Sequence, residues 1–154
     1  MLQSMMQLRS DTAGDGRFGS PRGNRKHLGV DFLCVPGQNI LSPVTGKVSK
    51  IGYPYPPPSI YRYIQISCTD EYGNEVQHRL FYVEPHMSIA RIDTEVIGHK
   101  TIIGYAQNVC IRYPGAKGMQ PHVHYEIRRV LLASKEYEYC DALFSDQIIR
   151  TNIK

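Results

Sequence analysis

The fold and the site that this sequence predicts both depend on the stretch "PHVHYEIR", residues 121–128. It is rich in β-branched and aromatic residues, which is typical of a strand. On a strand, His122 and His124 project from the same face with Cα atoms about 6.6 Å apart, while Val123 faces the opposite side. Both imidazoles can then reach one metal ion, or one can bind it while the other stands beside it.

Short runs of the same kind recur along the chain, for example "GVDFLCV" at 29–35, "YRYIQISC" at 61–68 and "HRLFYVEP" at 78–85. Turn signals such as "TG" at 45–46 and "PG" at 114–115 separate them. We therefore predict a mainly β protein, a single domain built as an antiparallel β-sheet or sandwich. The stretch "YPYPPPS" at 53–59 holds four prolines. Because proline removes ladder donors, we expect a loop at the rim of a cleft there.

The two ends of the chain differ from this pattern. Residues 1–16 are polar, Met-rich and then Gly/Asp-rich, and we expect an N-terminal arm, either loose or a short helix. Residues 17–154 would form the β domain. Residues 134–151, "SKEYEYCDALFSDQIIRT", are the one candidate helix.

Composition restricts the class of protein and its partners. The 154 residues are 42% hydrophobic and 21% charged, as in a soluble globular domain. No stretch approaches the roughly 20 apolar residues of a membrane span, and the N-terminus has no features of a secretion signal. The net charge of +4 suits an anionic partner such as a cell-wall polymer. The basic run "RGNRK" at 22–26 is too short for a nucleic-acid footprint, so we expect no nucleic-acid partner.

The four cysteines do not predict a metal site. Cys34, Cys68, Cys110 and Cys140 contain no CxxC pair, which makes a cysteine zinc site improbable. Their even number permits two disulfides. Because the chain lacks a signal peptide, free buried thiols are the favoured prediction.

A second stretch, "HLGVD" at 27–31, places a histidine and an aspartate four residues apart. On a regular strand this separation is about 13 Å, too far for two ligands of one ion. Gly29 and Val30 argue against a helix. We therefore expect the chain to turn at Gly29 and a strand to start at Asp31, so that His27 folds over the carboxylate.

Together the two stretches predict one Zn²⁺ ion. Two histidines and one carboxylate are a common catalytic zinc set, in which the fourth position is left for water. The hard carboxylate and the borderline imidazoles suit Zn²⁺ without a thiolate. Separately, each of these residues has an ordinary explanation as a surface, cap or turn residue.

These motifs resemble the lysostaphin/LytM-like zinc metallopeptidases that cut peptidoglycan cross-bridges. Four segments match in order: "GRFGSPRGNRKHLGVDF" (16–32), "PGQNILSPVTGKVSKIG" (36–52), "EVIGHKTIIGYAQN" (95–108) and "PHVHYEIR" (121–128). The resemblance implies a lysostaphin-like peptidase fold with a metal-binding cleft. It implies that His27, Asp31 and His124 are the metal ligands, and that His122 is a catalytic histidine.

The family has one more active-site histidine, in a strand that reads roughly Y-A-H-L. Here the corresponding run is "LFYVEPHMS" at 80–88, and counting from Tyr82 puts Glu84 at that position. His86 fills the role after a local shift at Pro85, or the role is empty. His78 and His99 match no motif, and we expect both at the surface.

A second resemblance is to the leukocyte cell-derived chemotaxins, which share "GVDFLC" (29–34), "FYVEP" (81–85) and "YPGAKGMQPHVH" (113–124) in related form. They resemble the peptidases and bind zinc, but they signal and lack the second catalytic histidine. This resemblance leaves two functions open. One is a zinc endopeptidase of peptidoglycan stem peptides or cross-bridges, and the alternative is a zinc-bound binding or signalling module without catalysis.

For an endopeptidase, the remaining expectations concern supporting residues and location. Glu126 lies on the face of the two histidines, where it either orients a ligand histidine or forms a surface salt bridge. Tyr61 or Tyr63 is a weak candidate for an oxyanion donor. "YPYPPPS" (53–59) and "IRYPGAKGMQ" (111–120) would be the walls of the cleft. The protein would reach the cell wall or periplasm after lysis, by virion delivery or by specialised export. The oligomeric state is not predicted.

Overall fold

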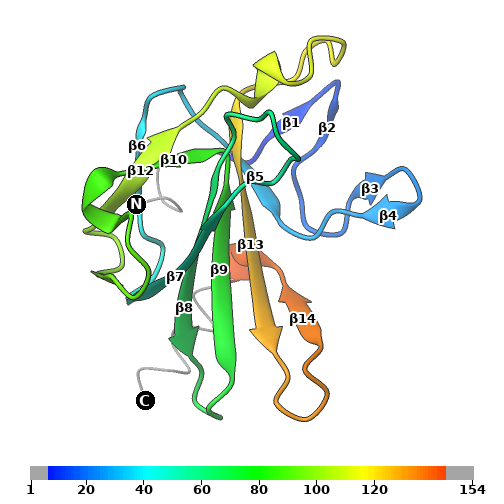
Figure 1. Ribbon diagram of the computed structural model, residues 1–154. Coiled ribbons are helices and arrows are strands. Elements are labelled where there is room, and N and C mark those ends of the chain that lie inside the picture. The colour runs from blue at the N-terminus through cyan, green and yellow to red at the C-terminus, as the bar shows by residue number, and fades with distance from the viewer. Residues whose placement is uncertain (1–6, 145–154) are drawn as a thin grey trace.

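The computed structural model describes residues 7–144, which fold around one long antiparallel sheet (Figure 1). The order of its strands is β11-β7-β8-β9-β13-β14. Along the same edge of β13, residues 122–125 pair with β5 and residues 127–130 pair with β14. The strands of this sheet are β5 (Val30–Leu33), β7 (Gly46–Gly52), β8 (Tyr63–Thr69), β9 (Glu75–Phe81), β11 (Glu95–Val96), β13 (His122–Val130) and β14 (Tyr137–Cys140). The prediction of a mainly β, antiparallel domain is confirmed, and it matches the lysostaphin-like fold.

Strand β13 is the longest strand of this sheet and has two different faces. Val123, Tyr125 and Ile127 are fully buried in the hydrophobic core. The alternate residues His122, His124 and Glu126 point to the opposite face, because side chains on a strand alternate. One face of β13 therefore stabilises the domain by apolar burial, which leaves the other face free to carry polar chemistry.

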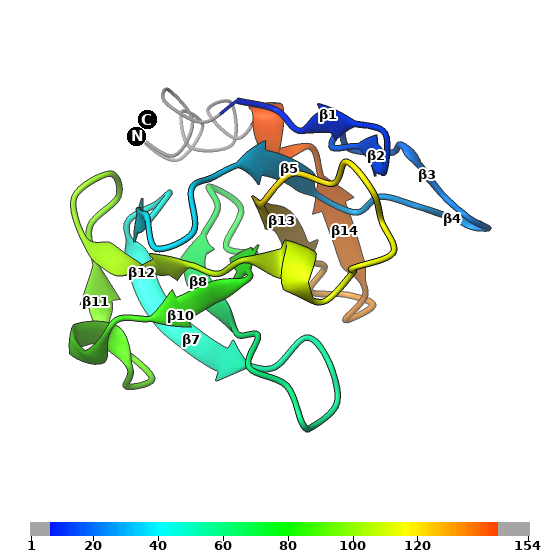
Figure 2. The same cartoon turned by 90° about the horizontal axis from the view of Figure 1, so that it is seen from above.

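A second, three-stranded sheet packs over one end of the first, as the view from above shows (Figure 2). Its order is β10-β12-β6, with β10 at Val83–Pro85, β12 at Ile102–Ala106 and β6 at Asn39–Leu41. Buried Ile40, Val83 and Ile103 join it to the common core. Three short 3-10 helices complete the fold: η1 (Met87–Ile89), η2 (Val109–Ile111) and η3 (Ala142–Phe144).

Residues 7–16 of the expected N-terminal arm (1–16) are neither loose nor helical, and residues 1–6 lie outside the described part of the chain. Residues from position 7 onward pack on the domain, and they form the hairpin of β1 (Ser10–Asp11) and β2 (Gly14–Asp15). Leu8 forms a bridge with Phe32 beside it, and the Arg9 side chain is buried. A second hairpin, β3 (Pro21–Arg22) and β4 (Arg25–Lys26), follows directly. Polar side chains set the path of this segment, because they find buried partners in the domain.

Two further expectations are corrected by the structure. Part of the candidate helix at 134–151 is strand β14, which pairs with β13, and its residues from 145 onward lie outside the described part. His78, expected at the surface, is completely buried in β9, where its Nδ1 lies 2.6 Å from the Tyr125 hydroxyl. His99 is exposed in a turn, as expected. All four cysteines are free and half-buried.

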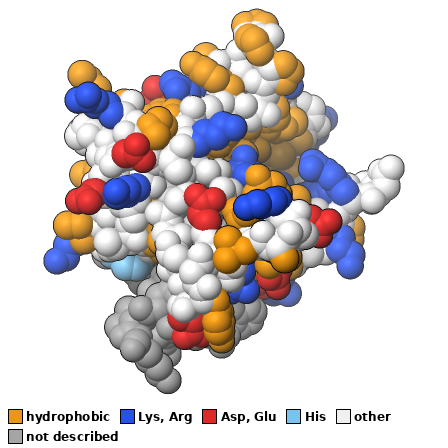
Figure 3. Space-filling model, turned by 60° about the horizontal axis from the view of Figure 1, so that its bottom comes forward, with side chains coloured by type: hydrophobic (Ala, Val, Ile, Leu, Met, Phe, Trp, Pro, Cys, Tyr) orange, Lys and Arg blue, Asp and Glu red, His pale blue; other side chains and the backbone are white. Residues whose placement is uncertain are grey.

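The surface and the helices support two further observations. On the face shown in Figure 3, basic side chains are interspersed with acidic ones and do not form a continuous basic patch. Within residues 7–144, no helix has the length and apolar character needed to cross a membrane.

Candidate metal centre and cleft

The pairing of β5 with β13 brings the two motifs of the sequence together. In this register Asp31 lies directly opposite His124, and His122 is two residues further along the same face. Cross-strand neighbours have Cβ atoms about 5 Å apart, so the carboxylate and the imidazole point into the same space. The sheet register thus assembles the centre from residues that are 93 positions apart.

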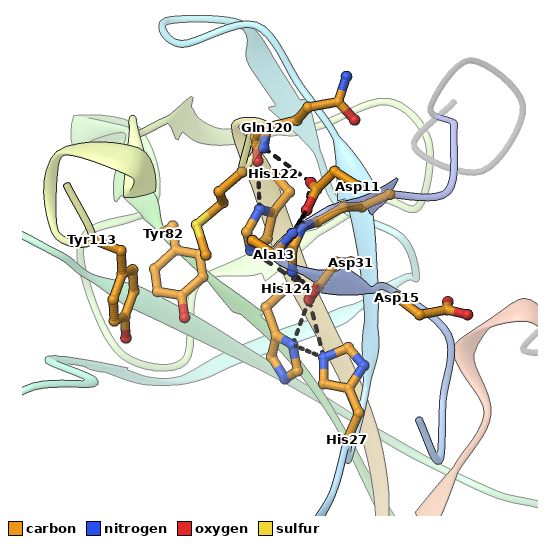
Figure 4. Close-up of polar contacts among 12 residues, drawn as sticks. Asp11, Ala13, Asp15, His27, Asp31, Tyr82, Tyr113, Gln120, His122 and His124 are labelled. Atoms are coloured by element: carbon orange, nitrogen blue, oxygen red, sulfur yellow. Dashed lines mark hydrogen bonds and ion pairs between the residues drawn. The ribbon is translucent and has the colours of Figure 1, made fainter. Parts of the chain in front are cut away.

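Three possible ligand atoms form a compact triangle at this point (Figure 4). Asp31 Oδ1 lies 2.9 Å from His124 Nδ1 and 3.1 Å from His27 Nε2, and the two nitrogens are 2.9 Å apart. Tetrahedral ligands at about 2.0–2.1 Å from a zinc ion would be roughly 3.3 Å apart. The triangle therefore needs little expansion to hold one ion.

The outer contacts of the two histidines decide which atoms face this triangle. His27 Nδ1 donates to the Arg17 carbonyl at 2.9 Å, and His124 Nε2 donates to Glu126 Oε1 at 2.9 Å. In a neutral imidazole the other nitrogen then carries a lone pair. With both rings neutral, two imidazole lone pairs and a carboxylate oxygen would converge within about 3 Å, an arrangement that needs a proton or a metal ion between them. This donor set fits a zinc ion.

The electrostatics of Asp31 and His124 agree with this interpretation. Burial alone would raise the pKa of Asp31, but hydrogen bonds with His124 and His27 lower it below its usual value. Burial lowers the pKa of His124, and its hydrogen bonds with Asp31 and Glu126 outweigh this and raise it to about 9. Both shifts show that the site favours a positive charge next to the carboxylate.

Gly29 makes the approach of the loop to β13 possible. The chain bends at this residue, as expected, before β5 begins at Val30. A Cβ atom at position 29 would lie 2.5 Å from the Tyr125 carbonyl oxygen and 2.9 Å from the His124 ring. The glycine of "HLGVD" is therefore required because the backbone passes directly against the His124 ring.

The second oxygen of Asp31 is held by arginines that sequence reasoning missed. Arg9 Nη1 lies 2.9 Å from Asp31 Oδ2, and Arg22 Nη2 lies 3.4 Å from the same oxygen. Arg9 also pairs with Asp11, which accepts a hydrogen bond from the Gln120 backbone N–H. These contacts leave Oδ1 for the triangle, so Arg9 fixes the orientation of the carboxylate.

His122 stands beside the triangle rather than in it. Its Nδ1 donates to the Gln120 carbonyl oxygen at 2.7 Å, which leaves a lone pair on Nε2, 3.8 Å from Asp31 Oδ2. Burial lowers the pKa of His122 below its ordinary value, so the ring is neutral at pH 7. A neutral imidazole with a free Nε2 is suited to accept a proton.

A cleft of about 410 Å³ opens over these residues. Pro54 and Tyr55 from 53–59 and Tyr113 and Met119 from 111–120 line it, as the sequence predicted for its walls. The first two hairpins supply the opposite side. The full lining comprises Arg9, Ala13, Arg22, Arg25, Lys26, His27, Leu28, Asp31, Pro54, Tyr55, Phe81, Tyr82, Tyr113, Met119, His122, His124 and Glu126.

Glu126 makes both of the contacts that were weighed for it. Its Oε1 accepts from His124, and its Oε2 pairs with Arg79 Nη1 at 3.0 Å. Arg79 also stacks over the rings of Tyr63 and Phe81. Glu126 therefore orients the His124 ring from behind, and Arg79 fixes Glu126 in turn.

The structure places the other candidate residues outside the cleft. His86 caps η1 and contacts Ser88, while Glu84 is exposed on β10 in the second sheet. The Tyr61 hydroxyl donates to the Asn108 carbonyl, and the buried Tyr63 ring stacks on Phe81. None of these four residues lines the cleft.

Tyr82, rather than Glu84 or His86, stands beside His122 in the cleft. Its ring meets the His122 ring edge-on at a centroid distance of 5.8 Å. After β9 ends at Phe81 the chain leaves for β10, so the residue at the end of the strand, rather than Glu84 or His86, faces the cleft. Sequence counting missed this because it placed the bend at Pro85, whereas β9 already ends at Phe81.

Comparisons with known proteins agree with this fold. No family model matches the chain. Leukocyte cell-derived chemotaxin-2 of Mus musculus is 30% identical over 120 residues, and that of Bos taurus is 28% identical over 120 residues. Each alignment covers 75% of this chain and 69% of the relative.

Two solved structures share the fold. The catalytic domain of the prophage-encoded M23 protein EnpA from Enterococcus faecalis superposes with a TM-score of 0.56 at 17% identity, over 90% of this chain and 89% of that one. The catalytic domain of the antimicrobial peptidase lysostaphin from Staphylococcus simulans gives 0.53 at 17% identity, over 82% and 86%. The molecule is thus a peptidase-like β domain. It belongs to the family of leukocyte cell-derived chemotaxin-2 and has the fold of the lysostaphin and EnpA catalytic domains.

Proposed function

We propose that this chain is a zinc-dependent endopeptidase that hydrolyses peptide bonds of bacterial peptidoglycan, in the stem peptide or the cross-bridge. The observation that carries the proposal is the convergence of three possible ligand atoms, on His27, Asp31 and His124, beside a neutral His122 at the floor of an open cleft. One zinc ion is held by the first three residues.

The reaction consumes one water molecule. When bound, zinc acts as a Lewis acid that polarises the scissile carbonyl and lowers the pKa of water. His122 Nε2 accepts a proton from the attacking water and delivers it to the leaving amine nitrogen as the C–N bond breaks. The Gln120 carbonyl keeps the His122 ring in the tautomer that this transfer needs.

The shape and charge of the cleft support an extended peptide of a wall polymer as substrate. One wall is tyrosine-rich, and the other carries Arg22, Arg25 and Lys26. The basic wall suits the carboxylates of peptidoglycan, and a net charge of +4 favours encounter with an anionic polymer. The site of action is the cell wall or periplasm, reached after lysis, by virion delivery or by specialised export.

A direct assay tests the proposal. Zinc-loaded protein is incubated with purified sacculi of several cross-bridge types, and newly released amines are counted and assigned by mass spectrometry. We expect new amines with wild type and none with a zinc-stripped sample. Stoichiometric zinc without release from any type of sacculus would contradict hydrolysis.

A second candidate function is a zinc-bound module that binds without hydrolysis. It is favoured by the chemotaxin relatives and by the cleft itself, whose lining in the described residues has no histidine besides His27, His122 and His124. The assay above separates the two candidates, because the second predicts binding to sacculi with no release of amines.

A further inference from the structure

Tyr82 has an uncommon backbone conformation at a decisive position. It follows the last residue of β9 and has φ of +68°, in the left-handed region that residues other than glycine rarely adopt. Its backbone N–H donates to the Arg62 carbonyl at 2.8 Å, and its own carbonyl accepts from the Gln107 backbone N–H at 2.8 Å. The surrounding structure thus holds Tyr82 in this conformation, as is common for residues at functional sites.

This conformation directs the Tyr82 ring into the cleft. Figure 4 shows Tyr82 and Tyr113 on one side of the histidines, and Asp11 and Asp15 on the other. The edge-on contact with His122 places the phenol beside the group that accepts the proton of water. Tyr82 is also flanked by Tyr55, whose ring is stacked at a centroid distance of 6.3 Å.

The hydroxyls of three tyrosines form a chain along this wall. The Tyr55 hydroxyl lies 3.1 Å from that of Tyr82 and 2.5 Å from that of Tyr113. Three hydroxyls carry three protons, and the two contacts between them use two. One O–H therefore remains to donate outside the chain. If Tyr113 donates to Tyr55 and Tyr55 to Tyr82, the remaining proton is on Tyr82, the member next to His122.

The phenol remains a donor at working pH. Burial raises the pKa of Tyr82 to about 12, so the hydroxyl is protonated at neutral pH. An immobile donor in a partly buried cleft is effective for charge that develops during a reaction, because it needs no reorganisation.

We propose that Tyr82 is a catalytic residue, whose hydroxyl donates a hydrogen bond to the carbonyl oxygen of the scissile peptide as negative charge develops there. It does the work expected of a second histidine, while Tyr55 and Tyr113 orient its proton. No proton is transferred from Tyr82, so the hydrolysis remains balanced by His122. The inference rests on the proposed endopeptidase function.

The test compares hydroxyl deletions that keep the rings. Tyr82→Phe, Tyr55→Phe and Tyr113→Phe are purified as the full zinc-loaded chain, with zinc content and thermal unfolding as checks of the fold. On sacculi, we expect Tyr82→Phe to lower kcat by about 100-fold or more, as for removal of one oxyanion donor, with KM within a few-fold. Tyr113→Phe should lower kcat by less than about 10-fold. Tyr82→His, which restores a ring donor, should recover most of the loss.

A binding measurement separates failure of this inference from failure of the endopeptidase function. Acetohydroxamate, a small anionic zinc-directed ligand, is titrated into each zinc-loaded variant by calorimetry. We expect Tyr82→Phe to weaken its affinity by about 10-fold or more, and Tyr113→Phe by less than about threefold. If wild type cleaves no sacculus but this difference holds, the donor role of Tyr82 stands and hydrolysis does not. Equal affinity in wild type and Tyr82→Phe, including no binding to either, would overturn the inference.

Discussion

Two parts of the cleft are built in different ways. They are its floor (His27, Asp31, His122 and His124) and its tyrosine wall (Tyr55, Tyr82 and Tyr113). The floor lies on paired strands, where the register of β5 and β13 fixes Asp31 opposite His124. The wall comes from loops, where a left-handed residue, Tyr82, and a chain of hydroxyls set the geometry. Strand pairing repeats one spacing and so makes a site rigid, whereas loops allow residues to be replaced. The floor should therefore determine metal binding, and the wall should determine whether bound substrate reacts.

The largest effect is expected at the floor. Asp31→Ala removes the only carboxylate of the triangle and leaves Arg9 and Arg22 without their shared partner. We expect zinc content after dialysis to fall from one ion per chain to below about a tenth, since a zinc site with two protein ligands is incomplete. Elemental analysis gives the content. Asp15→Ala, on the exposed surface, should keep full zinc, and equal zinc in both variants would contradict the ligand assignment.

His122→Ala separates chemistry from metal binding. Loss of a positioned general base lowers rates by about 10²–10⁴-fold, so kcat on sacculi should fall by that factor while zinc content is unchanged. His86→Ala is the matched control, because His86 lies outside the cleft, and its rate should equal that of wild type. A large loss of kcat in His86→Ala would show that His86 takes part in catalysis.

Arg9→Gln tests how far the floor depends on its outer contacts. Removing a partner that orients a ligand costs about 10–100-fold in metal affinity, and breaking a buried ion pair costs about 3–5 kcal/mol of stability. We expect both effects, measured by competition with a zinc chelator and by urea unfolding. Arg25→Gln, on the exposed rim, should change neither. Wild-type zinc affinity in Arg9→Gln would show that Asp31 is oriented without it.

The smallest effect concerns the reverse face of the floor, where His78 is buried. Burial lowers its pKa from 6.5 to about 3, so below pH 6.5 the unfolded chain binds a proton that the folded chain does not. Stability should therefore fall as pH decreases from 6.5 towards 3, by up to about 1.4 kcal/mol per pH unit. Urea unfolding at pH 7.0, 6.0 and 5.0 measures this slope.

His78→Leu should lose that part of the slope, while His99→Gln, in an exposed turn, should keep it. An unchanged slope in His78→Leu would mean that other groups cause the pH dependence.

Most residues of the site that could be predicted from the sequence lie on strands, whereas the position of Tyr82, which a loop sets, could not be predicted. The alternation of strand side chains was enough to place His122, His124 and Glu126 on one face. The same rule failed at "LFYVEPHMS" because the chain turns at Tyr82. No local sequence pattern predicts that a tyrosine adopts the left-handed conformation. Arg9 was missed because its partner Asp31 is 22 residues away. His78 was misplaced because a polar residue between Gln77 and Arg79 resembles a surface residue. In space its neighbours are Tyr125 and the core.

The sequence by itself determined the β architecture, the two ligand motifs and the family to which they belong. These features depend on residue type and local spacing, both of which can be read from the sequence. Only the tertiary structure decided that Arg9 holds the Asp31 carboxylate, that Glu126 supports His124, and that Tyr82 rather than His86 stands beside His122. Each of these results from contacts between segments far apart in the chain, and the register and turns of the folded sheets set such contacts.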